Sequence, residues 1–169
     1  MIYQRLPNVL SALSLLLAGL GTAHAEDLAS LKGTWIMVSA YEIHADGSRT
    51  TNYGEHPDGL FIVDAVGRYS MQIFRVGRPV FASGDKARGT PDEYRAALIG
   101  ISTHIGKVSI DAAHHQLVFD VEASSFPNWE GKRQVRDYTF EKGVLSYAVP
   151  ASASGSGTTA YSVWRRADD

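Results

Sequence analysis

Short runs rich in Val, Ile, Tyr, Phe and Thr alternate with turn signals along the whole sequence from Leu31 onward. In the run Arg68–Phe74, apolar and polar side chains alternate, as a strand with one buried face requires. Asp46-Gly47 and Lys142-Gly143 are typical of tight hairpin turns. About eight to ten such runs, spaced by roughly 8–12 residues, predict an all-β fold built as an antiparallel barrel or sandwich. The predicted strands are Gly33–Glu42, Arg49–Tyr53, Leu60–Val63, Arg68–Phe74, Ile101–Ile110, Leu117–Ala123, Val135–Glu141, Val144–Val149 and Thr158–Arg166.

One short helix is predicted between the runs that end at Phe74 and begin at Ile101. Thr90-Pro91-Asp92-Glu93 has the pattern of a capping box with proline at the first helical position. Gly100 is typical of a helix end. An apolar stripe at helical spacing supports this helix, and its members are Tyr94, Ala97, Leu98 and Ile101.

The first 25 residues have the pattern of a secretory signal peptide. Arg5 precedes the apolar stretch Val9–Leu20, and Ala23-His24-Ala25 fits a small-x-small cleavage site. The stretch is shorter than the roughly 20 residues that span a bilayer, which disfavours the alternative of a retained anchor. We therefore expect a signal peptide over 1–25, a single domain over 26–169, export to the periplasm or the medium, and no integral membrane span after processing.

Composition excludes several kinds of chemistry. The chain has no cysteine, so thiol catalysis and cysteine-ligated metal sites are absent. A net charge of −2 with scattered basic residues gives no electrostatic footprint for nucleic acid. The sequence has no nucleophile elbow, P-loop, dinucleotide fingerprint or zinc-protease motif. The histidines lack zinc-type spacing, so we expect no metal site and no cofactor.

Motifs along the chain resemble a known family. Gly33-Thr34-Trp35 begins the first strand and Trp164-Arg165-Arg166 ends the last. This pair is similar to the lipocalin and calycin pattern, in which a Trp at the barrel base packs under a basic residue of the last strand. The other segments that resemble the bacterial and fungal lipocalin-like domain family are Tyr53–Gly59, Gly67–Ile73, Arg78–Asp85, Pro91–Tyr94 and Ser124–Gly131. The resemblance covers nearly all of Leu31–Ala167, and it implies a closed lipocalin-like barrel while leaving the function open.

The sequence departs from the family pattern at its histidines. Family members often carry a His pair on the strand before the Ser124-Ser125-Phe126-Pro127 loop. Here that strand contains Asp120 and Glu122, and His114-His115 lies earlier, near a turn. A role that the resemblance would give to a strand histidine therefore does not carry over to this chain.

Two polar sets on neighbouring strands are candidate site residues. Asp120 and Glu122 share one face of their strand, and Gln134, Arg136 and Tyr138 share one face of the next. If both sets point inward, Arg136 pairs with a carboxylate and Tyr138 donates a hydrogen bond to a ligand. The alternative, which the apolar alternation favours, is that these residues form the solvent face.

Two loops supply further candidates. Arg75 and Arg78, followed by Phe81, are suited to bind an acidic ligand at a barrel mouth, or else they brace the loop through main-chain carbonyls. Phe126-Pro127-Asn128-Trp129 is typical of a lid or plug, with an exposed recognition surface as the less favoured alternative.

These observations favour a barrel that binds a small, mostly apolar or amphipathic metabolite carrying a polar or anionic group. The predicted ligand-binding residues are Tyr69, Met71, Phe81, Trp129, Arg136 and Tyr138 in the interior, with Arg78 at the mouth. A second hypothesis is a cofactor-independent isomerase or cyclase with Asp120 or Glu122 as the base, which requires inward carboxylates. A third is a structural or inhibitory barrel with a filled interior. The residues establish neither catalysis nor a catalytic group.

Overall fold

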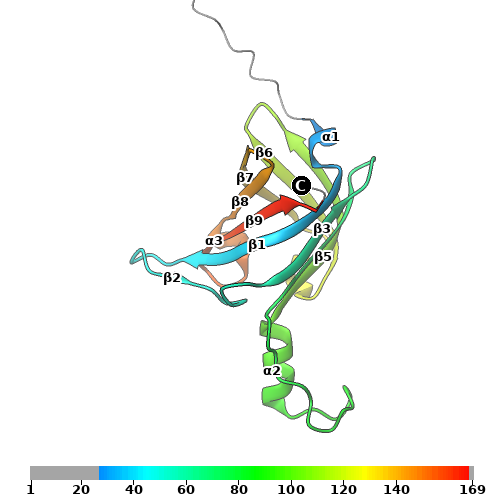
Figure 1. The fold of residues 1–169 in the computed structure, drawn as a ribbon, viewed down its shortest axis with the longest axis vertical. Coiled ribbons are helices and arrows are strands. Elements are labelled where there is room, and N and C mark those ends of the chain that lie inside the picture. Colours follow the sequence, from blue (N-terminus) through cyan, green and yellow to red (C-terminus); the bar gives the residue numbers. More distant parts are fainter. Residues whose placement is uncertain (1–26, 168–169) are drawn as a thin grey trace, which may run out of the picture.

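The computed structural model describes residues 27–167, which form a closed antiparallel β-barrel (Figure 1). The predicted signal peptide, Met1–Ala25, lies outside the described residues. The strands are β1 (Gly33–Ile43), β2 (Arg49–Thr50), β3 (Asp58–Val63), β4 (Arg68–Phe74), β5 (Ile101–Asp111), β6 (Gln116–Ser124), β7 (Arg133–Glu141), β8 (Val144–Val149) and β9 (Thr159–Arg166). The helical elements are α1 (Leu28–Leu31), α2 (Pro91–Ile99), the 3-10 turn η1 (Pro127–Trp129) and α3 (Ala151–Ser154).

The barrel closes because its first and last strands pair with each other. Each strand from β3 to β9 lies beside its neighbour in sequence, and β1 pairs with both β3 and β9. The resulting barrel has eight strands, and the two-residue β2 pairs only with the far end of β1. This architecture confirms the predicted all-β lipocalin-like barrel, including its one nine-residue helix.

A register shift in β1 changes which of its residues face the interior. Trp35 and Met37 are buried, the register with β9 then shifts between Met37 and Ser39, and Ala40 becomes the next buried residue. The bulge therefore moves even-numbered residues to the inner face. As a result, Glu42 lies at the inner side of the barrel end, where it lines a pocket.

One end of the barrel is plugged by α1. The indole nitrogen of Trp35 donates to the carbonyl of Leu31 at 2.8 Å. The Arg166 guanidinium lies 4.4 Å from the centre of the Trp35 ring and donates to the carbonyls of Lys32 and Ser30. This arrangement confirms the Trp-under-Arg pairing that the family resemblance implies. Aromatic side chains continue the core above it, namely Phe61, Tyr69, Phe119 and Trp164.

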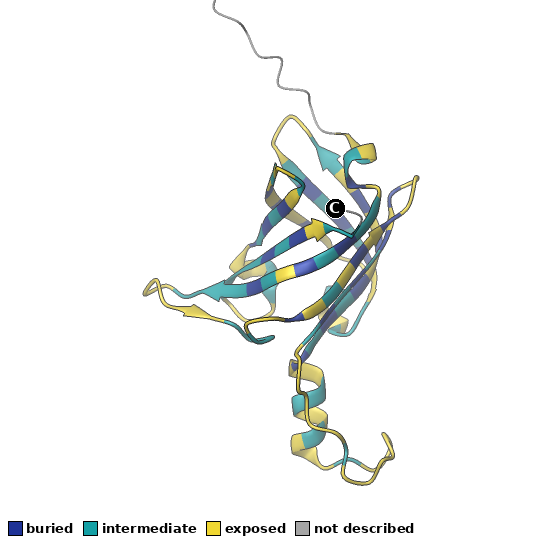
Figure 2. Cartoon of the chain, in the orientation of Figure 1, coloured by how far each residue is buried: buried dark blue, intermediate teal, exposed yellow. Residues whose placement is uncertain are grey.

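The longer connections gather at the opposite end, where α2 and its preceding loop project away from the barrel (Figures 1 and 2). Thr90 caps α2 as predicted, accepting from Glu93 N while the Glu93 carboxylate accepts from Thr90 N. The apolar stripe of α2 stays largely exposed, and Leu98 retains 52% of its accessible surface. Phe81 packs edge-to-face on Tyr94 within this projecting arm, 75–100. None of the helices in the described part of the chain is long and apolar enough to cross a membrane.

Candidate functional site

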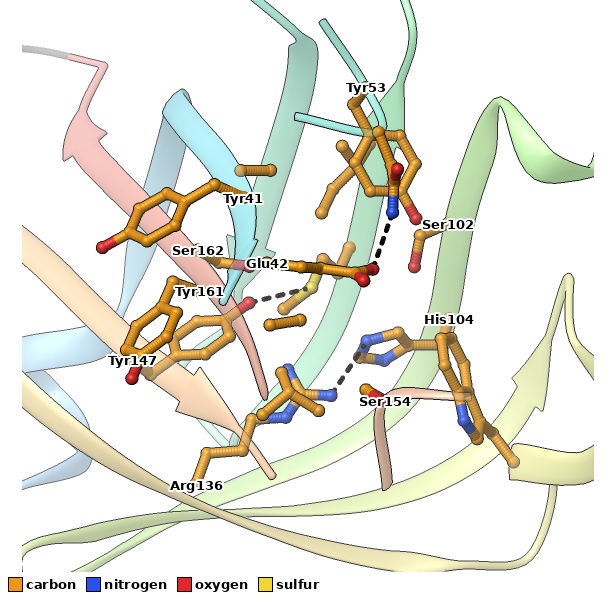
Figure 3. A pocket seen from close by; sticks show the side chains of 17 residues that line it. Tyr41, Glu42, Tyr53, Ser102, His104, Arg136, Tyr147, Ser154, Tyr161 and Ser162 are labelled. Carbon is orange, nitrogen blue, oxygen red and sulfur yellow. Dashed lines mark hydrogen bonds between the residues drawn. The ribbon is translucent and has the colours of Figure 1, made fainter. Parts of the chain in front are cut away.

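A pocket enters the barrel at the end opposite α1. Its cavity has a volume of about 60 Å3. Side chains from β1, β4, β5, β7, β8 and β9 line it, together with the β2–β3 connection and the loops that contain η1 and α3 (Figure 3). Apolar lining comes chiefly from Met71, Ile73, Trp129, Val149 and Ala160, and polar lining from Glu42, Asn52, Tyr53, Ser102, His104, Arg136, Tyr147, Ser154 and Ser162.

A buried arginine lies at the inner end of this pocket. Arg136 is only 3% exposed, because its β7 position pairs with Leu117 of β6 and shares the inner face with it. Its guanidinium carbon lies 4.1 Å from the ring centre of Phe119 and 5.0 Å from that of Tyr147. One terminal nitrogen donates to Gln134 Oε1 at 2.7 Å. Burial lowers the pKa of Arg136, although the side chain keeps its charge at physiological pH.

Arg136 also determines the tautomer of a buried histidine. Its Nη2 lies 3.3 Å from Nε2 of His104, and Nδ1 of His104 lies 2.7 Å from the hydroxyl of Tyr69. A guanidinium only donates, so Nε2 accepts and the ring proton resides on Nδ1, facing Tyr69. Burial, and then the nearby Arg136 charge, holds the pKa of His104 well below its usual value of 6.5. His104 is therefore a neutral member of the cluster.

Tyrosine hydroxyls of the interior stay protonated. Burial raises the pKa of both Tyr69 and Tyr147, and Arg136 opposes the shift in each case. The Tyr147 hydroxyl donates to the sulfur of Met71 at 3.1 Å. Burial also raises the pKa of Tyr53, whose ring lies at the pocket near Ser102 (Figure 3). The interior therefore offers neutral hydroxyls and one fixed cation.

A carboxylate lies nearer the mouth. Glu42 accepts from Asn52 Nδ2 at 2.8 Å, and its second oxygen accepts from the hydroxyl of Thr158. These bonds tie the β1 end to the connection that follows β2 and to the loop before β9. They also occupy the carboxylate, so the structure shows it bracing the mouth rather than pairing with Arg136.

Two loops contact each other over the pocket. The Trp129 ring packs edge-to-face on His104 at 6.0 Å and on Phe126 at 5.4 Å between ring centres. Gly155, in the left-handed conformation that ends α3, packs closely against Phe126 and Trp129, and any side chain there would meet Phe126. Phe126-Pro127-Asn128-Trp129 thus folds over the pocket, as expected for a lid or plug.

The structure brings together some of the predicted ligand-binding residues. Met71, Trp129 and Arg136 all line the pocket. Tyr69 lies just behind it, bonded to His104. Tyr138 is buried but lies outside the pocket, where its ring stacks on the His115 ring at 4.3 Å.

Arg78 and Phe81 lie outside the pocket on the projecting arm. Arg78 is exposed, and its guanidinium lies 5.0 Å from the Phe74 ring centre. Phe81 contacts Tyr94 and the backbone region of Gly89. The sequence placed both at the barrel because it did not reveal that the connection between β4 and β5 turns outward.

The two polar sets of β6 and β7 lie on opposite sides of the barrel wall. Asp120 faces outward and binds Arg133 at 2.8 Å, and Glu122 faces outward and binds Arg68 at 2.9 Å. The expectation that the two sets share one environment was therefore wrong. Gln134 and Arg136 oppose Phe119 and Leu117 in the β6–β7 register, so only the β7 set faces inward. The isomerase hypothesis loses its proposed base, because it required inward carboxylates.

The prediction of binding residues missed most of the polar residues that line the pocket, and Ser102, His104 and Glu42 show why. Ser102 and His104 sit at the inward positions of β5, in the same alternation as buried Val108. That polar interruption of an apolar face was a usable signal. Glu42 was not identifiable, because its inward placement depends on the β1 bulge.

The described part of the chain contains no cluster of metal-ligating side chains. No group of three or more His, Asp or Glu side chains gathers there in a way suited to hold a metal ion. His114 binds Asp111 within the β5–β6 turn at 2.8 Å, and that contact lowers the pKa of Asp111.

Comparisons with known proteins found a sequence relative, a solved structure and a family model. A 4'-hydroxy-3'-methoxypropiophenone carrier protein from Aspergillus oryzae is 25% identical over 105 residues, covering 57% of this chain and 95% of that protein. A solved structure of a redesigned β-barrel aligns with a TM-score of 0.40 at 13% identity, over 82% of this chain and 93% of that one. The family model of the lipocalin-like domain matches residues 32–167. The chain therefore belongs to the lipocalin-like domain family.

Proposed function

We propose that this barrel binds and carries a small, mostly apolar metabolite in the pocket beneath η1 and α3. The observation that carries the proposal is the asymmetry of the barrel. One end is filled by α1 and the Trp35–Arg166 pair, whereas the other holds a pocket with apolar walls and polar groups at its inner end. Such a combination is typical of small-molecule sites.

The Aspergillus oryzae relative supports both the carrier role and the kind of ligand. Its name assigns it the transport of 4'-hydroxy-3'-methoxypropiophenone, an aromatic ketone. A flat aromatic ring suits a pocket walled by Met71, Ile73, Trp129 and Val149. A small aromatic metabolite is therefore the ligand class that we propose.

The volume of the cavity sets a condition on binding. About 60 Å3 is far below the roughly 300 Å3 or more of metabolite sites, so a ligand enters only if the lid moves. Opening the lid requires the contacts of Trp129 with His104, and of Gly155 with Phe126 and Trp129, to separate. The same small volume favours the second candidate, a structural or inhibitory barrel with a filled interior, and that candidate predicts no uptake of any ligand.

Titration with N-phenyl-1-naphthylamine, an uncharged aromatic dye that fluoresces in apolar surroundings, separates the two candidates. We expect saturable, 1:1 binding by the purified barrel. Ser154→Trp places a bulky ring at the pocket mouth and should abolish it, whereas Ser156→Trp on the same loop lies outside the pocket and should not. No dye binding by the unmodified chain, with no metabolite co-purifying in native mass spectrometry, would establish the filled barrel instead.

We also propose that the domain acts after export. The support is the sequence pattern of residues 1–25, with its cleavage site after Ala25. Intact mass measurement on protein made in a bacterial host, after fractionation, should find a chain that begins at Glu26 outside the cytoplasm. Recovery of only the full-length chain in the cytoplasm would contradict this proposal.

A further inference from the structure

The arginine at the inner end of the pocket has a charge that the described residues do not neutralise. None of the four ion pairs in residues 27–167 includes Arg136. The carboxylate of the same pocket, Glu42, is bound by Asn52 and Thr158 instead. Strand β6 directs Asp120 and Glu122 to the outside, where Arg133 and Arg68 bind them. Buried charges in proteins are nearly always paired, so an isolated buried guanidinium requires an explanation.

The hydrogen-bonding capacity of Arg136 is also incompletely used. A guanidinium has five N–H donors, and here Nη2 donates to Gln134 and His104 while Nε has no partner among the described residues. Gln134 Nε2 is likewise buried without a partner in this part of the chain. Unused donors beside an uncompensated charge form an arrangement complementary to an acidic oxygen pair.

The neighbours of Arg136 hold it in place without neutralising it. Phe119 and Tyr147 present ring faces to the guanidinium, and Gln134 and His104 supply neutral acceptors. The cation is therefore preorganised and buried, which strengthens its interaction with an anion. Met71 and Ile73 supply apolar walls in the same pocket.

We propose that Arg136 is the receptor for an acidic group, so that the ligand class is a small aromatic acid whose carboxylate or acidic enol reaches the guanidinium. This inference rests on the proposed carrier function and names its specificity. The ring of the ligand lies among the apolar walls, and the acid replaces the counterion that the barrel itself does not supply. A ligand without an acidic group leaves Arg136 uncompensated and binds less tightly.

Cinnamate and cinnamamide provide a matched test, because they differ only in charge and polar head group. Each is titrated against bound N-phenyl-1-naphthylamine. We expect cinnamate to compete at least about tenfold more strongly, the effect of one charge-assisted hydrogen bond. In Arg136→Met the preference should fall to within about twofold while the uncharged dye still binds. Arg136→Lys, which keeps the charge but not the planar fork, should retain a smaller preference.

The control is Arg133→Met, because Arg133 is on the same strand but faces solvent. It should keep the full preference for cinnamate. Dye binding with equal competition by acid and amide would overturn the anion receptor and leave the carrier function intact, whereas no dye binding at all overturns the carrier function itself. Thermal stabilisation by millimolar chloride or phosphate, with none by cinnamate, would show an inorganic anion site and would also overturn the proposal.

Discussion

The two ends of the barrel each place an arginine over an aromatic ring, but the two arginines differ in whether their hydrogen-bond donors have partners. Arg166 lies 4.4 Å from the Trp35 ring centre and directs its donors to the carbonyls of Lys32 and Ser30. Arg136 lies 4.1 Å from the Phe119 ring centre and leaves a donor without a partner in the described residues. The first arginine closes the fold, whereas the second lines a pocket. The two arginines thus differ in their hydrogen-bond donors. Those of Arg166 bind main-chain carbonyls at the structural end, whereas Arg136 keeps an unused donor at the binding end.

The largest expected effect is a loss of folding stability when the contacts of Arg166 at the structural end are removed. Arg166→Met removes two hydrogen bonds from a charged donor and the contact with Trp35. We expect the free energy of unfolding to fall by about 3 kcal/mol or more, since each of the two bonds contributes at least about 1.5 kcal/mol and the ring contact adds to them. Urea denaturation measures it, with Arg165→Met, at the exposed neighbouring residue, as the control. A loss no greater than that of the control would show that Arg166 does not secure this end.

The next effect is a dependence of folding stability on pH, which His104 at the binding end produces. The lowered pKa of His104 means that the folded barrel keeps the ring neutral, while the unfolded chain binds a proton below about pH 6.5. Between about pH 6.5 and the lower pKa of the folded state, acidification therefore destabilises the fold by up to about 1.4 kcal/mol for each pH unit. His104→Gln should remove this dependence, measured as unfolding free energies at pH 7.5 and 5.5. Parallel losses in both proteins would contradict the assignment of a neutral buried histidine.

A smaller effect of opposite sign is expected at Arg136. Replacing an uncompensated buried cation with an apolar residue of similar length removes a desolvation cost. Arg136→Met should therefore raise the free energy of unfolding by about 1 kcal/mol, measured in urea without ligand. A loss of about 2 kcal/mol or more would show that the hydrogen bonds of Arg136 to Gln134 and His104 outweigh its desolvation cost, and the two arginines would then be alike.

The smallest effect concerns the outer carboxylates. Asp120 is largely exposed, and the hydrogen bond from Arg133 lowers its pKa. Asp120→Asn and Glu122→Gln should leave dye binding unchanged, because both side chains lie outside the barrel wall. Fluorescence titration checks this. A change in affinity comparable to that of Ser154→Trp would show that these carboxylates belong to the binding site.

Much of the fold was predictable because it depends on local patterns. Alternation in Arg68–Phe74, the capping box at Thr90 and the Gly33-Thr34-Trp35 motif all report on neighbouring residues, and each is realised in the structure. The direction of the β4–β5 arm was not predictable, because an apolar stripe on α2 does not reveal whether anything covers it.

The candidate site was less predictable because inward facing depends on register between strands. The pairing of Arg136 with Leu117 separates it from Asp120, and no pattern within β7 alone shows this. The bulge in β1 likewise decides the placement of Glu42. A shift of one residue exchanges the two faces of a strand, so sequence alternation identifies two sets without saying which is inside.

The seam between β1 and β9 has a consequence for how the chain acquires its shape. The first and last strands of the barrel pair with each other, from Trp35 with Arg166 to Ile43 with Thr159. Without β9, the strands β1 and β8 would each have an unpaired edge, which is a template for aggregation. Contacts between such distant segments make folding slow. The chain is therefore most prone to aggregate before β9 has paired with β1 and β8.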